Sequence, residues 1–211
     1  VVGLDAGALE RLGARWPDDR LRLVHGNATD PATVAPLATA ADCVISAVNY
    51  WYNAELARIA VDGRAHFVDL GGNNDVVARE YELDDAAQES GVTIVPDCGL
   101  APGVANILGY HLATRLDRCE SLRLRVGGLP QRPLPPLNYQ LVFAVQGLIN
   151  EYVEPAVVVR DGERKIVPGL GELETLTFPE PFGELEAFQT SGGTSTLPQT
   201  LAGRVRQLDY K

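Results

Sequence analysis

The sequence contains no methionine, three cysteines and two lysines among its 18 basic residues. An odd number of widely spaced cysteines (Cys43, Cys98 and Cys119) argues against a disulfide framework and indicates free thiols, so we expect a reducing, cytoplasmic location. The absence of methionine indicates that the chain does not start at a natural start codon, and we expect a piece of a longer protein. A mechanism that needs a lysine has only Lys165 and Lys211 as candidates.

Charge and hydropathy exclude further classes of protein. The net charge of −10 argues against nucleic acid or anionic membrane as a partner, because both require a basic surface. No apolar run approaches the ~20 residues of a membrane-spanning helix. The three histidines lack the spacing of metal ligands, so we expect no metal. We therefore expect a globular protein that binds a small molecule, with no nucleic-acid or membrane partner.

Short apolar runs alternate with amphipathic stretches in the first hundred residues. This alternation is typical of βαβ units around a parallel sheet that is buried on both faces. The predicted architecture is therefore α/β, a partial Rossmann-like, doubly wound parallel sheet. We expect strands at 1–4, 21–25, 43–48, 67–70 and 92–95, and helices from 8, from 31, over 53–61 and over 76–90.

The second half has a different pattern, which indicates an α+β domain with a mostly antiparallel sheet. Residues 104–116 are expected to form a helix, and Asp161-Gly162-Glu163 is a turn signal between two apolar runs. We place a dinucleotide-binding domain over 1–110 and a substrate-binding or dimerisation domain over 111–211. Further strands are expected at 121–126, 156–160, 164–167, 173–178, 185–190 and 205–210.

The ligand crevice of a doubly wound sheet lies outside the carboxyl ends of its strands. The G-x-G-x-x-G turn that binds a pyrophosphate is absent from this sequence. Asp5 ends the first apolar run, where an acid can bond the adenosine ribose, but it can equally cap the following helix. Ser46, Ala47 and Asn49 end another run, where small residues let a dinucleotide approach the backbone. A tight turn, with Asn49 as a helix cap, is the alternative there.

Several motifs follow one another in a fixed order and spacing, and they lie at 68–72, 95–108, 126–130, 135–139 and 186–195. Together they resemble the lysine 6-dehydrogenase branch of the saccharopine dehydrogenase family. The resemblance implies NAD or NADP bound by a Rossmann half, a substrate held by an α+β half, and a homodimer. Gly3 stands where many relatives have an acid, which leaves the choice between NAD and NADP open. The family's segments that follow Lys211 are absent.

The resemblance extends the set of expected cofactor contacts. Asn27 and Ala28 match the family's adenine-contacting stretch, although a turn explains them equally well. Leu70, Cys98 and Gly99 complete the predicted cofactor-binding set. We expect Cys98 to be a small apolar neighbour of the nicotinamide rather than a nucleophile.

Asp69 and Asp97 end two predicted strands and are the candidate catalytic residues. A carboxylate there can hold the substrate amine or accept its proton, whereas the alternative is a bond to nearby backbone N–H groups. Candidate substrate-binding residues are Tyr50 and Tyr139, which can instead pack in the core or at a dimer contact, and a donor-rich loop that can instead cap a helix. That loop contributes Gly193, Thr194 and Ser195.

The resemblance predicts an NAD(P)-dependent oxidoreductase that oxidises the ε-amine of L-lysine to a semialdehyde. The alternatives are a saccharopine dehydrogenase or a related carboxyalkyl-amine dehydrogenase and, in another class, a non-catalytic family member or dimerisation module. Because the pyrophosphate loop is absent, we expect the 211 residues by themselves to bind NAD weakly and to be inactive.

Overall fold

The computed structural model describes residues 1–136 and 138–211, which form two compact units. The first unit comprises Val1–Asp69 and Asp75–Pro96, and the second comprises Leu70–Asn74 and Asp97–Lys211. These units differ from the expected division after residue 110. The reason is that α6 (Val104–Thr114) packs against β6 (Cys119–Leu124) and contributes Ala113 to the core of the second unit.

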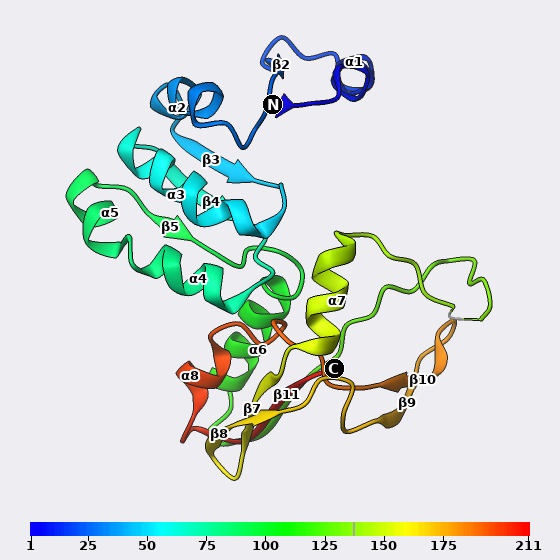
Figure 1. Ribbon diagram of the computed structural model, residues 1–211. Helices are drawn as coiled ribbons and strands as arrows, with labels where there is room; N and C mark the ends of the chain where they lie inside the picture. Colours follow the sequence, from blue (N-terminus) through cyan, green and yellow to red (C-terminus); the bar gives the residue numbers. More distant parts are fainter. Residues whose placement is uncertain (137) are drawn as a thin grey trace. The chain divides into compact units, whose positions relative to one another are not determined.

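The first unit alternates strands with helices, which agrees with the α/β class predicted from the sequence (Figure 1). The elements are β1 (Val2–Gly3), α1 (Ala6–Arg15), β2 (Val24–His25), α2 (Pro31–Thr39), β3 (Cys43–Ser46), η1 (Tyr50–Tyr52), α3 (Asn53–Asp62), β4 (His66–Asp69), α4 (Asn74–Tyr81), α5 (Asp84–Ser90) and β5 (Ile94–Val95).

All strand pairs of the first unit are parallel, but they form two sheets where the sequence suggested one. β1 pairs only with β2, over two residues, while β3, β4 and β5 form a three-stranded sheet. In that sheet Ser46 is in register with Asp69, and Val68 with Val95. The carboxyl ends of β3 and β4 therefore lie side by side, as the crevice argument requires.

Local signals explain where the helices begin and end. The Asp30 side chain accepts a hydrogen bond from the Ala32 backbone N–H, and Pro31 occupies the first turn, as predicted. The single helix expected over 76–90 is wrong, because the chain breaks between α4 and α5. At this break Leu83 turns inward and packs against the core of the first unit.

The core of the first unit is built where α2 and α3 pack together against β4. Ala57, Ala60 and Ala65 are completely buried, as is Phe67 of β4. Small side chains on the helices allow close approach, so that the aromatic ring of Phe67 fills the remaining space. Burial of this face fixes the sheet whose strand ends form the predicted cofactor region.

The second unit combines a mixed four-stranded sheet, a separate hairpin and three helices. The sheet order is β6-β11-β7-β8, in which β6 and β11 are parallel and the other two pairs are antiparallel. The expectation of a mostly antiparallel sheet therefore holds except at β6. The remaining elements are α7 (Val145–Val153), β7 (Ala156–Arg160), β8 (Glu163–Val167), β9 (Glu174–Phe178), β10 (Gly183–Ala187), α8 (Leu197–Leu201) and β11 (Val205–Tyr210).

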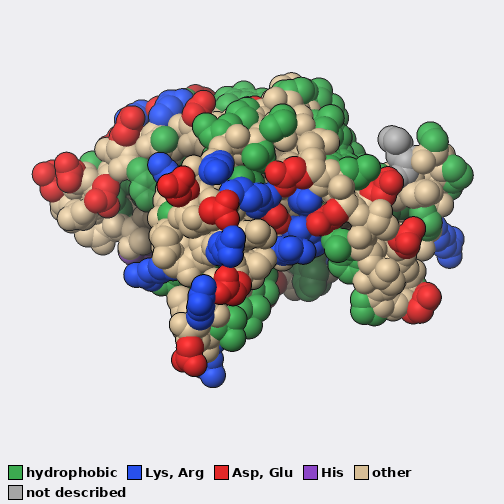
Figure 2. Space-filling view, turned by 90° about the horizontal axis from the view of Figure 1, so that it is seen from below, with side chains coloured by type: hydrophobic (Ala, Val, Ile, Leu, Met, Phe, Trp, Pro, Cys, Tyr) green, Lys and Arg blue, Asp and Glu red, His purple; other side chains and the backbone are tan. Residues whose placement is uncertain are grey.

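The two faces of this sheet have opposite character. One face carries the apolar core, with Leu208 of β11 completely buried among side chains of α6 and α8. The other side carries a charged cluster in which Arg125 contacts Asp209 and Glu174, and Arg160 contacts Asp209. Figure 2 shows acidic and basic side chains interleaved on one face of the molecule. Within 1–136 and 138–211, no helix is long and apolar enough to cross a bilayer.

Candidate functional site

The central feature of the second unit is a contact between Asp97 and Ser195. The Ser195 Oγ donates a hydrogen bond of 2.6 Å to Oδ2 of Asp97, which is only 9% exposed. Both residues have a positive φ, +60° for Asp97 and +45° for Ser195. Such conformations are uncommon for residues with a side chain, and they cluster at ligand sites where the surrounding structure enforces them.

Glycines allow the backbone to close around the Asp97 carboxylate. A Cβ atom on Gly71, whose φ is +74°, would overlap Asp97 Oδ1, and a Cβ on Gly99 would lie 2.8 Å from the Leu70 carbonyl oxygen. Leu70, Gly71 and Gly99 therefore belong to one tight arrangement around Asp97. The predicted residues Leu70, Asp97 and Gly99 are in this way brought together within one unit.

Asn106 provides a second link to the loop that contains Ser195. Its side-chain Nδ2 donates to the Gly193 carbonyl oxygen at 3.1 Å, and its Oδ1 accepts from the Gly103 N–H at 2.7 Å. Asn106 was not among the residues predicted for the site. Its position three residues after Gly103, at the start of α6, is the capping-box signal that could have identified it.

The loop residues Gly193 and Thr194 have defined roles in packing. The ring of Tyr210 lies against Gly193, where a Cβ would overlap the ring. The Thr194 hydroxyl donates to the Val157 carbonyl oxygen at 3.2 Å, which fastens the loop to β7. Of the three predicted loop residues, only Ser195 has its side chain bonded to another predicted site residue.

Glu151 of α7 is an acid that sequence reasoning missed. Its backbone oxygen accepts from the Ser191 N–H at 2.9 Å, which places it beside the same loop. Burial raises the pKa of the Glu151 carboxyl from 4.5 to about 7. Its charge also raises the pKa of three tyrosines, Tyr139, Tyr152 and Tyr210, whose pKa values burial raises first.

α7 was not predicted, although its signal is present in the sequence. Apolar and aromatic residues recur at the i, i+3, i+4, i+7 and i+8 spacing of one helix face, at Val145, Leu148, Ile149, Tyr152 and Val153. A single acid among the apolar and aromatic residues of 145–153 was the available hint.

In the first unit, the predicted residues at the end of β3 differ in their roles, since one makes a structural hydrogen bond and two are exposed. The Ser46 hydroxyl, which is buried, donates to Oδ1 of buried Asn53 at 2.7 Å. Ala47 and Asn49 are exposed, and Asn49 makes no side-chain capping bond to η1. Asp69, in register with Ser46, is completely buried.

Asp5 and Asn27 adopt the structural alternatives named in the sequence analysis, a helix cap for Asp5 and a turn for Asn27. Asp5 Oδ1 accepts from the Ala8 N–H at 2.9 Å and caps α1. Asn27 Oδ1 accepts from the Thr29 N–H at 3.0 Å in a turn that includes Ala28. Both arrangements leave the cofactor contacts of these residues as predictions.

Tyr50 and Cys98 complete the predicted set. Tyr50 begins η1 directly after the third strand, and its ring meets that of Trp51 edge to face at 5.3 Å. Cys98 follows Asp97, is exposed and, in the part of the chain that the structure describes, is in no disulfide. Their predicted contacts with substrate and cofactor remain predictions.

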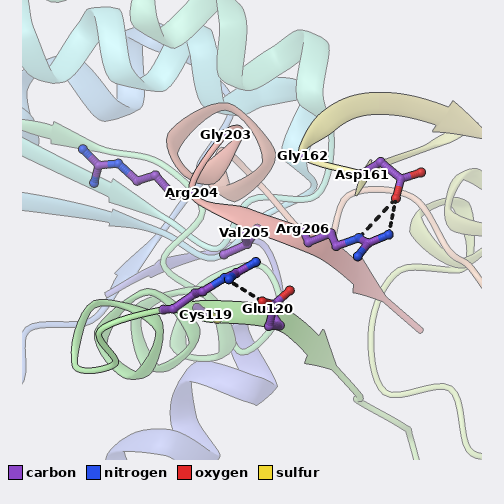
Figure 3. A pocket seen from close by; sticks show the side chains of 9 residues that line it. Cys119, Glu120, Asp161, Gly162, Gly203, Arg204, Val205 and Arg206 are labelled. Atoms are coloured by element: carbon purple, nitrogen blue, oxygen red, sulfur yellow. Dashed lines mark hydrogen bonds and ion pairs between the residues drawn. The ribbon is translucent and has the colours of Figure 1, made fainter.

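A surface pocket of about 440 Å³ lies at the other end of β11, away from Tyr210 (Figure 3). Most of its charged side chains are paired with one another, Arg118 with Glu120 and Arg206 with Asp161. The predicted site residues are all absent from its lining. The lining residues are Arg118, Cys119, Glu120, Asp161, Gly162, Gly203, Arg204, Val205 and Arg206.

Comparison with known proteins identifies the family. The family model of the saccharopine dehydrogenase C-terminal domain matches residues 99–209. The chain belongs to this family. The match includes Asn106, Glu151 and Ser195, while Asp97 lies two residues before it and Tyr210 one residue after it. The resemblance inferred from the sequence motifs is confirmed.

Curated relatives extend the similarity over most of the chain. The chain is 22% identical over 199 residues to the mitochondrial alpha-aminoadipic semialdehyde synthase of Bos taurus, covering 91% of this chain and 21% of that protein. It is 27% identical over 141 residues to the saccharopine dehydrogenase [NADP(+), L-glutamate-forming] of Pyricularia oryzae, covering 61% of this chain and 29% of that protein. The chain therefore spans less than a third of the length of either relative.

A solved structure supports the fold. Apo saccharopine dehydrogenase (L-Glu forming) from Saccharomyces cerevisiae superimposes with a TM-score of 0.77 at 18% identity, over 100% of this chain and 48% of that one. This likeness confirms the α/β fold class that the sequence predicted.

Proposed function

We propose that this chain is part of a nicotinamide-dependent dehydrogenase that oxidises the ε-amine of L-lysine to the semialdehyde. The observation that carries the proposal is the buried Asp97 carboxylate, oriented by the Ser195 hydroxyl. Both residues lie in motifs that resemble the lysine 6-dehydrogenase branch, and membership of the saccharopine dehydrogenase family supports a reaction at a carbon–nitrogen bond.

In this proposal Asp97 handles the proton of the substrate amine. The ε-ammonium gives a proton to the Asp97 carboxylate, and the neutral amine then loses a hydride from its ε-carbon. The Ser195 hydroxyl holds the carboxylate in one orientation and stabilises its charge before the proton arrives. The resulting iminium adds water and releases ammonia, which leaves the aldehyde.

The cofactor expected here is NAD or NADP, which supplies the hydride acceptor when bound. The carboxyl end of β3 fits such a group, because Ala47, Val48 and Asn49 are exposed there and Ala47 carries only a methyl side chain. The exposed Asn49 side chain would bond to the group there. This fit concerns only the part of the cofactor that would lie over the carboxyl end of β3. It does not extend to the pyrophosphate, because the sequence has no G-x-G-x-x-G turn to bind it.

Saccharopine is the second candidate substrate, because two of the relatives are named for enzymes of that type. A carboxyalkyl-amine needs a further carboxylate-binding group, for which an arginine is the usual choice. Arg125 and Arg160 of the second unit both already contact carboxylates. Neither of these two is therefore expected to bind a substrate carboxylate.

We also propose that the protein acts as a homodimer in the cytoplasm, on a small-molecule amino acid, without a nucleic-acid or membrane partner. Ile107, Leu108 and Leu112 of α6 are more than half exposed, which supports a further protein contact. The free thiols of Cys43 and Cys98 support a reducing compartment. Light scattering of the purified protein after size-exclusion chromatography would test the dimer.

The decisive experiment is a turnover assay of the full-length protein. Reduction of NAD and of NADP would be followed separately with L-lysine and with saccharopine. Reduction with L-lysine alone is the expected result, and reduction with saccharopine alone would replace the proposal by the second candidate. If neither NAD nor NADP is reduced with either substrate, the proposed function is overturned in favour of a non-catalytic relative.

A further inference from the structure

Asn106 lies in the first turn of α6, and its side chain bonds to two different segments of the backbone. Its Oδ1 accepts a hydrogen bond from the Gly103 N–H at 2.7 Å, and its Nδ2 donates to the Gly193 carbonyl oxygen at 3.1 Å. Gly193 is 87 residues farther along the chain than Asn106. The Asn106 amide therefore joins the segment that follows Asp97 to the loop that contains Ser195.

The segment that follows Asp97 is tightly folded. The Val104 N–H donates to the Gly99 carbonyl oxygen at 2.9 Å, and a Cβ added to Gly103 would overlap that carbonyl group. Gly103 also has a φ of +136°, a conformation that residues with a side chain rarely adopt. Because Gly99 is only two residues after Asp97, this close contact ties the position of the Gly103 N–H to that of Asp97.

The loop of Ser195 is held by other elements of the same unit. The Thr194 hydroxyl donates to the Val157 carbonyl oxygen of β7 at 3.2 Å, and Gly193 lies against the ring of Tyr210 of β11. These contacts fix the loop to the sheet. The bond from Asn106 to the Gly193 carbonyl oxygen adds a connection to the segment of Asp97, and it lies only two residues before Ser195.

A carboxamide is the side-chain group that this connection needs. It carries an acceptor and a donor on opposite sides of one planar group. The Gly103 N–H requires an acceptor, so the amide oxygen faces Gly103 and the amide nitrogen faces the Gly193 carbonyl. A carboxylate at this position would satisfy Gly103 but would have no proton for Gly193, and an apolar side chain would satisfy neither.

We propose that Asn106 is a positioning residue for the reaction at Asp97. By holding the Gly193 carbonyl, Asn106 places the Ser195 hydroxyl where it donates to the Asp97 carboxylate. This inference rests on the proposed function, in which Asp97 accepts the proton of the substrate amine. Asn106 acts through Ser195, so its effect on the reaction depends on the Ser195 hydroxyl.

Helix capping alone is the other role that Asn106 can have, since its bond to the Gly103 N–H satisfies a backbone donor at the start of α6. Asn106→Asp separates the two roles, because aspartate keeps the acceptor for Gly103 and loses the donor for Gly193. We expect Asn106→Asp to impair the reaction as Asn106→Ala does, and it replaces the alanine variant if that one does not fold. Wild-type activity of Asn106→Asp would overturn the proposal in favour of capping alone.

The first test is a double-mutant cycle on the full-length protein, with kcat/KM for L-lysine as the readout. Asn106→Ala should lower kcat/KM about three- to thirtyfold in the wild type but less than about twofold in Ser195→Ala, because the hydroxyl that it positions is then absent. Thr114→Ala, which removes an exposed hydrogen bond at the other end of α6, is the matched control and should change neither value. Equal losses with and without the Ser195 hydroxyl would overturn the proposal.

The second test requires no turnover and uses Cys98, which is exposed and directly follows Asp97. A trifluoroacetone label on Cys98 is observed by fluorine NMR in a protein whose other exposed cysteines, Cys43 among them, are replaced by serine. Asn106→Ala and Ser195→Ala should each move the signal, and their shifts should not add in the double variant.

Additive shifts, or an unchanged signal in Asn106→Ala, would overturn the positioning role. Non-additive shifts in a protein that oxidises neither L-lysine nor saccharopine would retain the role of Asn106 in placing Ser195 and overturn the proposed function.

Discussion

Ser195 and Asp97 are 98 residues apart in the sequence, yet the Ser195 hydroxyl donates a hydrogen bond of 2.6 Å to the Asp97 carboxylate. Both residues have a positive φ, which only a well-determined surrounding structure can maintain. Gly71 leaves room for the carboxylate, and Asn106 holds the loop of Ser195 through the Gly193 carbonyl. The pair is thus supported from both sides within one unit.

Removing the Ser195 hydroxyl should impair catalysis more than stability. Ser195→Ala leaves the Asp97 carboxylate without its oriented donor, and we expect kcat/KM of the full-length protein to fall about ten- to a hundredfold. Thr200→Ala is the control, because the exposed Thr200 hydroxyl bonds only to the Thr196 carbonyl oxygen of its own helix. Equal activity of Ser195→Ala and Thr200→Ala would contradict the role assigned to Ser195.

Gly193 should tolerate no side chain. A Cβ there would overlap the Tyr210 ring, and the ring is too buried to move freely, so Gly193→Ala should lower the free energy of unfolding by about 1–3 kcal/mol. Urea denaturation measures this change. Gly127→Ala is the matched control, since its nearest neighbour would be 3.5 Å away, at ordinary contact distance. A wild-type midpoint for Gly193→Ala would disprove the packing argument.

The charged side of the second unit's sheet should be sensitive to loss of Asp209. Its side chain, 10% exposed, contacts both Arg125 and Arg160, so Asp209→Ala leaves two largely buried cations with one partner fewer. We expect a loss of about 3–5 kcal/mol in the free energy of unfolding. Asp62→Ala breaks an ion pair with Arg58 whose carboxylate is 64% exposed and should cost less than about 1 kcal/mol. Similar losses for the two variants would show that burial does not set the strength of these pairs.

Glu151 should make the stability of the protein depend on pH. Its pKa is about 7 in the folded protein and 4.5 when unperturbed, so the folded state binds this proton more tightly than the unfolded state does. This group therefore contributes no difference below about pH 4.5, lowers stability progressively as the pH rises from 4.5 to about 7, and keeps that loss above 7.

Glu151→Gln, which resembles the protonated acid, removes this dependence. In thermal unfolding, the melting temperature of the variant should rise relative to that of the wild type between pH 4.5 and about 7. The difference in melting temperature should stay constant at higher pH. Glu163→Gln, on an exposed strand, serves as the reference for a simple loss of one negative charge. A pH-independent difference between Glu151→Gln and the wild type would show that the carboxyl titrates normally in the folded state.

Local sequence determined much of the fold. Asp30-Pro31 begins α2, Asn53 begins α3, and Asp161 and Gly162 turn the β7–β8 hairpin, because each signal acts within a few residues. The strand predicted over 205–210 is present with the same bounds. Two features were missed. α7 was overlooked although Val145, Leu148, Ile149 and Tyr152 follow helical spacing, and the turn at Leu83 divides what looked like one helix.

The sequence by itself therefore determined the α/β class, the family and the presence of an acid at residue 97, because these follow from local patterns and from motifs of fixed order. Only the tertiary structure decided that Ser195 bonds to Asp97 and that Asp5 caps a helix. It alone also bonded the Glu151 backbone to Ser191, in the loop that leads to Ser195. The physical reason is that these contacts depend on which strands pair and which side chains lose water, and neither is encoded within a short segment of chain.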